Sequence, residues 1–256
     1  MSYQKTFRRY ELKYLITKDQ QEELIYRMKK YMAQDEFAKS TISNIYFDTP
    51  DKLFIRNSLE KPIYKEKLRV RSYGTPSADS AVFIELKKKY KGVVYKRRIN
   101  MEEKIASSYL VDRMPLLEKS QISNEIDYLY DIHSNLEPSV FLSYEREAFF
   151  SKTDTNFRMT FDQNITFRDY DLSLTSGVYG EKILDDQWVV LEVKTVYGLP
   201  KWLLDFFNEC QIVKTSFSKY GSAYTQHILP KYLENLTKKQ DKYREHDNKG
   251  DGINVA

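Results

Sequence analysis

The sequence has few of the residues that cross-link or interrupt a chain. Its 256 residues include one cysteine, Cys210, with only 8 glycines and 7 prolines. A single cysteine excludes an internal disulfide and is typical of a reducing compartment. The scarcity of glycine and proline leaves little room for linkers, so we expect one domain over residues 1–235. The polar stretch 236–256 carries mixed charges and few apolar residues, which predicts a disordered tail.

Long apolar runs and the common nucleotide-binding motifs are also absent. No stretch approaches the ~18 uninterrupted apolar residues that a membrane span requires, and the N-terminus lacks a signal-peptide core. We therefore expect a soluble, cytoplasmic protein. Neither G-x-x-x-x-G-K-[ST] nor G-x-G-x-x-G occurs, so side chains would have to hold any nucleotide. His133, His227 and His246 are too scattered for a zinc site.

Aromatic and charged residues are abundant instead. The chain has 21 tyrosines and 14 phenylalanines, a composition that favours sheet, and 30% of its residues are charged. Alternation of polar and apolar residues predicts strands over residues 6–16, 43–47, 64–73, 81–89, 93–100, 140–151, 157–167 and 188–197. Helices are expected over 18–32, 52–58, 200–209 and 219–229, and within 101–135, where Pro115 interrupts them. Thr17 and Gln20 form a capping-box pattern before the first helix. The order of elements predicts an α+β fold with an antiparallel sheet.

Basic side chains recur on one face of strand after strand. Successive residues of a strand point to opposite faces, so the odd positions of residues 65–71 share one face and are all basic, whereas Leu68 and Val70 lie opposite. On any single strand, an ordinary solvated face explains this pattern better. Repetition over six strands predicts a shared interior, a basic channel with helices outside. The same parity places these further residues there: Arg9, Glu11, Lys13, Glu85, Lys87, Lys96, Arg98, Arg158, Glu192 and Lys194.

An interior crowded with cations favours an anionic ligand. Two unit charges ~6 Å apart repel by roughly 3 kcal/mol at an effective dielectric constant of about 20. A polyanion relieves this repulsion, and guanidinium and ammonium groups match phosphate oxygens. The few carboxylates, Glu11, Glu85 and Glu192, suit a hard divalent cation shared with phosphates.

Short motifs in a fixed order resemble a known superfamily. YFDTPD (residues 46–51), KLRVR (67–71) and IELK (84–87) are similar to motifs of the triphosphate tunnel metalloenzymes. Six further motifs resemble one family of this superfamily, the polyphosphate polymerase domain of the VTC (vacuolar transporter chaperone) family. They are YELKY, KRR, SYERxAF, FRMTFD, LEVK and SFSKY, and the resemblance extends over about residues 7–225. The resemblance implies an antiparallel tunnel barrel of about eight strands with flanking helices. It also implies transfer of the γ-phosphate of ATP to a growing polyphosphate chain with Mn²⁺ or Mg²⁺.

The resemblance also implies roles for particular residues. Seven cations would hold phosphates in the catalytic site: Lys13, Arg69, Arg71, Lys87, Arg146, Arg158 and Lys219. Glu192 would bind the metal. Six further residues on the same face are expected to contact the substrate: Lys67, Lys96, Arg98, Lys194, Glu11 and Glu85.

Two departures keep other functions open. Tunnel hydrolases carry Glu-x-Glu-x-Lys on their first strand, but the matching positions here are Arg9, Glu11 and Lys13. Loss of the first carboxylate argues against a two-metal triphosphatase, although a tunnel triphosphatase stays an alternative. The sequence also shows no phosphate-sensing domain and no membrane segment, so we expect either a separate membrane protein partner at the cytoplasmic face of a membrane or a product that stays inside the cell.

Two non-enzymatic functions are further alternatives. One is a catalytically idle module that binds polyphosphate or nucleotide. The other is a single-stranded nucleic-acid binder, since tyrosines interleave with the basic strands. Such a binder should display its basic face openly and lack internal carboxylates, so we expect no nucleic-acid partner.

Asp48 is interpreted as a helix cap rather than a catalytic acid.

Overall fold

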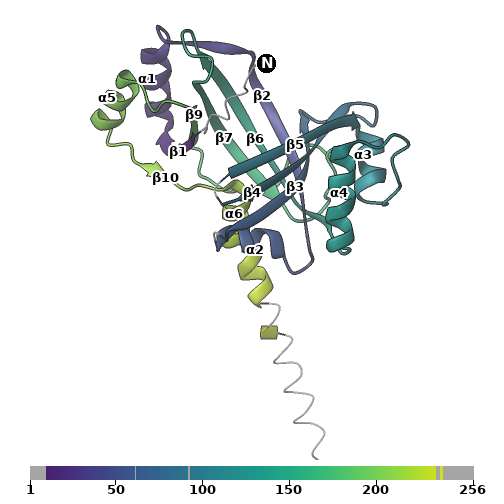
Figure 1. Cartoon of the computed structure of the whole chain (residues 1–256). Coiled ribbons are helices and arrows are strands. Elements are labelled where there is room, and N and C mark those ends of the chain that lie inside the picture. Colours follow the sequence, from purple (N-terminus) through teal and green to yellow (C-terminus); the bar gives the residue numbers. More distant parts are fainter. Residues whose placement is uncertain (1–9, 61, 92, 235–236, 239–256) are drawn as a thin grey trace, which may run out of the picture.

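One antiparallel sheet organises the chain (Figure 1). The structure is a computed structural model that describes residues 10–60, 62–91, 93–234 and 237–238. Ten strands pair in the order β10-β1-β9-β7-β6-β2-β3-β4-β5, with β8 beside β7. Helices flank the sheet, which confirms the α+β class. The expected tail, apart from residues 237–238, lies outside the described residues, as does Arg9.

The strand boundaries agree with the sequence pattern best in the β3–β5 meander. The strands are β1 Tyr10–Thr17, β2 Met32–Asp48, β3 Tyr64–Tyr73, β4 Ala81–Tyr90, β5 Val93–Glu102, β6 Glu137–Ser151, β7 Arg158–Arg168, β8 Glu181–Lys182, β9 Trp188–Thr195 and β10 Lys214–Thr215.

Strand β2 is much longer than the expected 43–47 segment. The first helix ends at Met28, and β2 begins at Met32, where the helix was expected to end. The N-terminal half of β2 does not alternate polar and apolar residues, and it pairs with the long strand β6 through an irregularity in register between Gln34 and Lys39. Pairing with β6, which is distant in the sequence, therefore determines that this region is a strand, and the local sequence pattern could not reveal it.

The helices follow the expected order. They are α1 Lys18–Met28, α2 Leu53–Leu59, α3 Glu103–Leu110, α4 Gln121–Ile132, α5 Lys201–Glu209 and α6 Lys219–Ala223, which continues into the π-helix η1 Tyr224–Ile228. The capping box at α1 is confirmed, because the backbone N–H of Gln20 donates to Oγ1 of Thr17 and the N–H of Thr17 donates to Oε1 of Gln20. In the part of the chain that the structure describes, no helix is long and apolar enough to cross a membrane.

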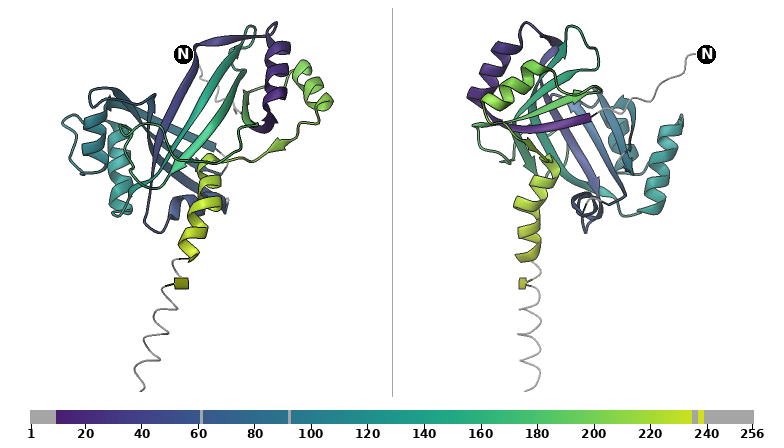
Figure 2. Two further views of the ribbon diagram at one scale, coloured as in Figure 1. Left: turned by 180° about the vertical axis from the view of Figure 1, so that it is seen from behind. Right: turned by 60° about the vertical axis from the view of Figure 1, so that its left-hand side comes forward.

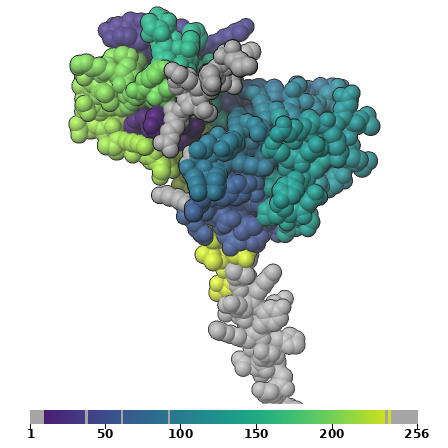
Figure 3. Space-filling model, in the orientation of Figure 1, coloured from purple at the N-terminus to yellow at the C-terminus, as the bar shows by residue number. Residues whose placement is uncertain are grey.

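Two groups of helices cover the outer face of the sheet (Figure 2), and apolar residues pack between the helices and the sheet. Helices α3 and α4 cover one end, where Leu68, Ile84 and Leu86 pack with Tyr109 and Ile126. Helices α1 and α5 cover the other end, over residues of β1, β7 and β9. Figure 3 shows α1 and α5, from distant parts of the sequence, forming one side of the molecule. On β3 and β4 the apolar parity thus faces helices, and the charged parity faces the inner side of the sheet. A third apolar cluster, which includes Leu142, Val190 and Tyr220, packs on the inner side next to the charged residues.

Strand pairing does not close the sheet into the expected barrel. Strands β5 and β10 end the strand order, and no pairing joins them among the described residues. The edge of β1 is occupied instead by β10, with Lys13 opposite Thr215. The chain then leads into α6, whose first turn brings Lys219 and Tyr220 to the inner face of the sheet. A helix turn rather than a further strand therefore completes this wall.

Candidate phosphate-binding site

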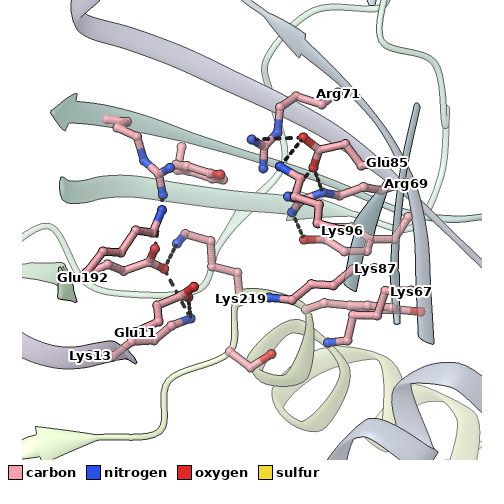
Figure 4. Close-up of a pocket in the computed structure, with 16 residues that line it drawn as sticks. Glu11, Lys13, Lys67, Arg69, Arg71, Glu85, Lys87, Lys96, Glu192 and Lys219 are labelled. Atoms are coloured by element: carbon pink, nitrogen blue, oxygen red, sulfur yellow. Dashed lines mark hydrogen bonds and ion pairs between the residues drawn. The ribbon is translucent and has the colours of Figure 1, made fainter. Parts of the chain in front are cut away.

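A pocket of about 250 Å³ lies on the inner face of the curved sheet. Its wall contains nine cationic side chains and three carboxylates, an excess of six positive charges. Twelve of the fourteen predicted site residues line it: Glu11, Lys13, Lys67, Arg69, Arg71, Glu85, Lys87, Lys96, Arg146, Glu192, Lys194 and Lys219. They come from β1, β3, β4, β5, β6, β9 and α6 (Figure 4). The strand parities predicted from the sequence therefore do converge on one surface.

The other two predicted residues lie outside this wall. Arg98 stacks on the ring of Phe83, with its guanidinium carbon 3.6 Å from the ring centroid, and its Nε is 3.8 Å from Glu85. Arg158 is exposed and lies beside Lys194 in the register of β7 and β9. A phosphate-binding role for either residue stays a prediction.

The first cluster of charges surrounds Glu85. Nη2 of Arg69 is 2.6 Å from its carboxylate, Nζ of Lys96 is 2.7 Å away, and Nη1 of Arg71 is 3.7 Å away. The Glu85 side chain is only 2% exposed. Burial opposes its ionisation, but the charges of Arg69, Arg71 and Lys96 outweigh burial and lower the pKa of Glu85 to about 2. Glu85, on β4, is thus a fixed anion that holds cations from the two neighbouring strands, β3 and β5.

The second cluster joins Asp162 and Glu192. Arg146 forms a bidentate pair with Asp162 at 2.6 and 2.7 Å, and Nζ of Lys219 is 2.5 Å from the same carboxylate. Glu192 lies 3.2 Å from Lys13, 3.5 Å from Lys219 and 3.6 Å from Arg146. Burial raises the pKa of both carboxyl groups, but the charges of Lys219 and Arg146 outweigh it, so both pKa values fall below their ordinary range.

Asp162 was not among the predicted site residues. It shares the inward parity of β7 with Arg158 and Thr160, and it lies in the FRMTFD motif, so the sequence did contain a signal for it. Its side chain is fully buried behind Arg146 and Lys219. It therefore positions two cations without itself lining the pocket.

Three tyrosines in the wall were also missed. The hydroxyl of Tyr46 accepts a hydrogen bond of 2.8 Å from Arg69. Burial raises the pKa of Tyr46, but the charges of Arg69, Lys67 and Arg71 outweigh burial and lower it to about 8. The ring of Tyr144 lies under Lys219 and Arg146, at 4.4 and 5.2 Å. Tyrosine is common in strands, so the sequence gave no separate signal for these residues.

Tyr220, the third tyrosine of the pocket wall, contacts Asp48, which was interpreted from the sequence as a helix cap. That interpretation is confirmed, because the carboxylate of Asp48 accepts hydrogen bonds from the backbone N–H groups of Phe54 and Ile55 in the first turn of α2. It also accepts from the hydroxyl of Tyr220 at 2.9 Å. Asp48 therefore fixes the start of α2 and the position of α6, which carries Lys219.

Lys67 and Lys87 differ from the other cations of the pocket. They lie directly opposite each other on β3 and β4, and within the described residues neither has a carboxylate at ion-pairing distance. Burial, with the nearby charges of Lys65, Lys87 and Lys13, lowers the pKa of Lys67 to about 8. These two ammonium groups are available to an anion from outside the protein.

The protein side chains do not form a complete metal cage. In the described ranges, no three His, Cys, Asp or Glu residues gather at a candidate metal position. Glu192 and Glu11 do both approach Lys13, at 3.2 and 3.9 Å. Mg²⁺ commonly binds through one or two carboxylates together with waters and substrate phosphates. The residues present therefore fit a divalent ion only when phosphates share its coordination.

The fold and the family are both recognised by comparison with known proteins. No curated protein matches the sequence. A "putative adenylate cyclase" from Bacillus halodurans superposes with a TM-score of 0.51 and 15% identity, covering 81% of this chain and 92% of that one. A Hippeastrum protein, described as a putative adenylyl cyclase with a dominant triphosphatase activity, gives 0.50 and 14%, covering 84% and 94%. Such low identities show the fold alone. The model of the VTC domain matches residues 8–228, and the chain belongs to the VTC domain family.

Proposed function

We propose that this protein is a divalent-metal-dependent polyphosphate polymerase that transfers the γ-phosphate of ATP to a growing polyphosphate chain. The observation that carries the proposal is the excess of six positive charges in a pocket of about 250 Å³. A string of phosphates supplies many negative charges, and its oxygens accept charge-assisted hydrogen bonds from guanidinium and ammonium groups. Membership of the VTC domain family supports the same substrate class.

The side chains divide the work of binding and charge neutralisation. Arg69, Arg71 and Lys96 face the ligand from the Glu85 cluster, and Lys13, Arg146 and Lys219 face it from the Glu192 cluster. A terminal oxygen of the acceptor chain attacks the γ-phosphorus, a new P–O bond forms, and the bond to the β-phosphate oxygen breaks with release of ADP. No protein nucleophile is needed, because alignment and neutralisation of charge lower the barrier.

A divalent ion, Mn²⁺ or Mg²⁺, would be held by Glu192 together with substrate phosphates. When bound, it would neutralise charge on the transferring phosphoryl group. Glu192 is suited to this role because its lowered pKa keeps it ionised and its side chain lines the pocket. Lys13 and Lys219 hold the carboxylate in place.

The direct test is turnover by the purified protein. Incubation with ATP and Mn²⁺ or Mg²⁺ should release ADP and produce polyphosphate, visible on a gel. Release of inorganic phosphate from triphosphate without polyphosphate would support a tunnel triphosphatase, the activity named for the Hippeastrum protein. Tight binding of polyphosphate without turnover would support a catalytically idle module. Absence of any binding to triphosphate or polyphosphate would contradict all three.

A further inference from the structure

Four lysines on β3 and β4 form a basic strip that extends beyond the pocket. Lys67 and Lys87 line the pocket wall, and Lys65 and Lys89 follow two residues further along the same two strands. Residues two apart on a strand share a face and lie about 7 Å apart, so all four belong to the inner face. We name Lys65, Lys67, Lys87 and Lys89 the lysine track. Lys65 and Lys89 do not line the pocket itself.

The register of β3 and β4 sets these lysines in opposing pairs. Lys67 lies opposite Lys87, and Lys65 lies opposite Lys89. Like charges directly opposite each other destabilise a sheet. Figure 4 shows Lys67 and Lys87 next to each other, on the side of the pocket away from Glu192. Two successive like-charge pairs are an arrangement that a bound polyanion would stabilise.

On the outer face of β4 and β5, by contrast, two cations have a carboxylate partner within the protein. Lys88 of β4 and Arg97 of β5 both pair with Glu125 of α4, at 3.5 and 3.2 Å. On the inner face, no described carboxylate lies at ion-pairing distance from Lys67, Lys87 or Lys89. Nζ of Lys65 donates to the backbone carbonyl of Ser58. The excess of charge is therefore specific to the face that continues the pocket.

The track also lies at a defined end of the pocket. Lys67 is next to Leu68, which pairs with Phe47 near the C-terminal end of β2. Arg158 and Lys194 lie at the other end of the sheet, because Arg158 pairs with Phe150, which pairs with Ala33 near the N-terminal end of β2. A linear anion longer than the pocket would contact Lys65 and Lys89 if it leaves the pocket toward the start of β3 and the end of β4.

We propose that the lysine track binds the part of a linear polyphosphate chain that extends beyond the pocket, so that affinity increases with chain length. The inference rests on the proposed phosphate-binding function and adds a second contact region to it. Triphosphate is short enough to be held by the pocket alone. A longer chain also contacts Lys65 and Lys89, and each contact contributes to affinity and to its dependence on salt.

Chain length is the variable that tests the track. The wild-type protein and the variants Lys89→Gln, Lys65→Gln and Lys88→Gln are titrated with triphosphate and with long-chain polyphosphate at several salt concentrations. Lys88→Gln is the matched control, since it removes the same charge from the adjacent position on the outer face. Lys89→Gln should weaken long-chain binding about fivefold and flatten its salt dependence, with triphosphate binding changed less than about twofold. Lys65→Gln should act in the same direction.

Three outcomes would contradict the proposed role of the lysine track. One is an equal loss of affinity for both ligands in Lys89→Gln, and another is an equal loss of long-chain binding in Lys88→Gln. The third is a single-stranded oligonucleotide that binds the wild type as tightly as polyphosphate and is weakened equally by Lys89→Gln. In the first two cases triphosphate still binds the wild type and the proposed function survives, whereas the third favours a single-stranded nucleic-acid binder. If the wild type binds neither triphosphate nor polyphosphate, the proposed function fails and the track fails with it.

Discussion

Glu85 has four cationic neighbours and almost no contact with solvent. Its role in the absence of substrate is to keep Arg69 and Arg71 close together, and their charges would otherwise repel. Glu85→Gln should lower the free energy of unfolding by about 3 kcal/mol, because it leaves buried cations without a counter-charge. Triphosphate should recover more stability in this variant than in the wild type, since it supplies the missing negative charge.

The pH dependence of this effect has a defined sign. The pKa of Glu85 is lowered to about 2 in the folded protein from an ordinary value of 4.5, so its stabilising contribution is fully present above pH 4.5. It is lost as the pH falls toward 2, and the difference between wild type and Glu85→Gln should shrink over that range. Urea unfolding at a series of pH values measures this. Glu125→Gln, which breaks a partly exposed pair on the outer face, is the control and should cost under about 1 kcal/mol.

Lys67 and Tyr46 give the pocket a second titration, near pH 8. The pKa of Lys67 and that of Tyr46 both lie at about 8. As pH rises through 8, Lys67 loses its positive charge and Tyr46 gains a negative one, so both changes oppose anion binding. Triphosphate affinity should therefore fall between about pH 7 and 9, and binding in that range should take up protons.

Lys67→Arg isolates the lysine contribution, since a guanidinium stays charged throughout this range. The variant should bind triphosphate about as well as the wild type near pH 7 and show a flatter pH dependence. Calorimetry in two buffers of different ionisation enthalpy counts the protons taken up. Comparison of the two proteins cancels the ionisation of triphosphate itself. Identical proton uptake by both proteins would show that Lys67 does not titrate in this range.

Among the elements, the strands of the β3–β5 meander were the most predictable from sequence. Their alternation is regular, because Leu68, Ile84 and Leu86 face a helix layer while the basic residues face the pocket. The first half of β2 could not be predicted, since its polar residues form a strand only by pairing with β6. The place of Lys219 in the pocket came from the family motif alone. Lys219 reaches the pocket because α6 packs beside α2, where Tyr220 donates a hydrogen bond to Asp48, 172 positions earlier in the chain.

This docking predicts the effect of a single hydroxyl group. Tyr220→Phe removes two buried hydrogen bonds, the one that the Tyr220 hydroxyl donates to Asp48 and the one that it accepts from the Ser139 hydroxyl. The free energy of unfolding should fall by about 1–2 kcal/mol, because Asp48 and Ser139 lose a partner in a buried setting. Triphosphate affinity should fall only slightly, since Asp162 still holds Lys219. Urea unfolding and a triphosphate titration measure the two quantities. A large loss of affinity at unchanged stability would mean that the Tyr220 hydroxyl contacts the ligand directly.

At the scale of the whole molecule, the two charge clusters come from opposite halves of one sheet. The Glu85 cluster belongs to β3, β4 and β5, and the Glu192 cluster belongs to β1, β6, β7, β9 and α6. A ligand that contacts both clusters connects the two ends of the strand order, which strand pairing leaves unjoined. Strand parity predicted the Glu85 cluster and the inward position of Lys13 and Glu192, whereas Arg146 and Lys219 were expected only from the family resemblance. The open sheet could not be foreseen, because closure depends on which element takes the edge of β1.

The last prediction separates an enzyme from a binding module. Glu192→Gln keeps the size of the side chain and removes the charge that would hold a divalent ion among the substrate phosphates. Triphosphate should bind this variant at least as well as the wild type, because the cations of the wall remain and one competing carboxylate is gone. Metal-dependent turnover should fall by at least about 100-fold, since the ion loses its protein ligand. Thermal melting with millimolar triphosphate reports the first quantity, and ADP release reports the second. Full metal-dependent activity in Glu192→Gln would refute the assignment of Glu192, and loss of both binding and turnover would show that its main role is to position Lys13 and Lys219.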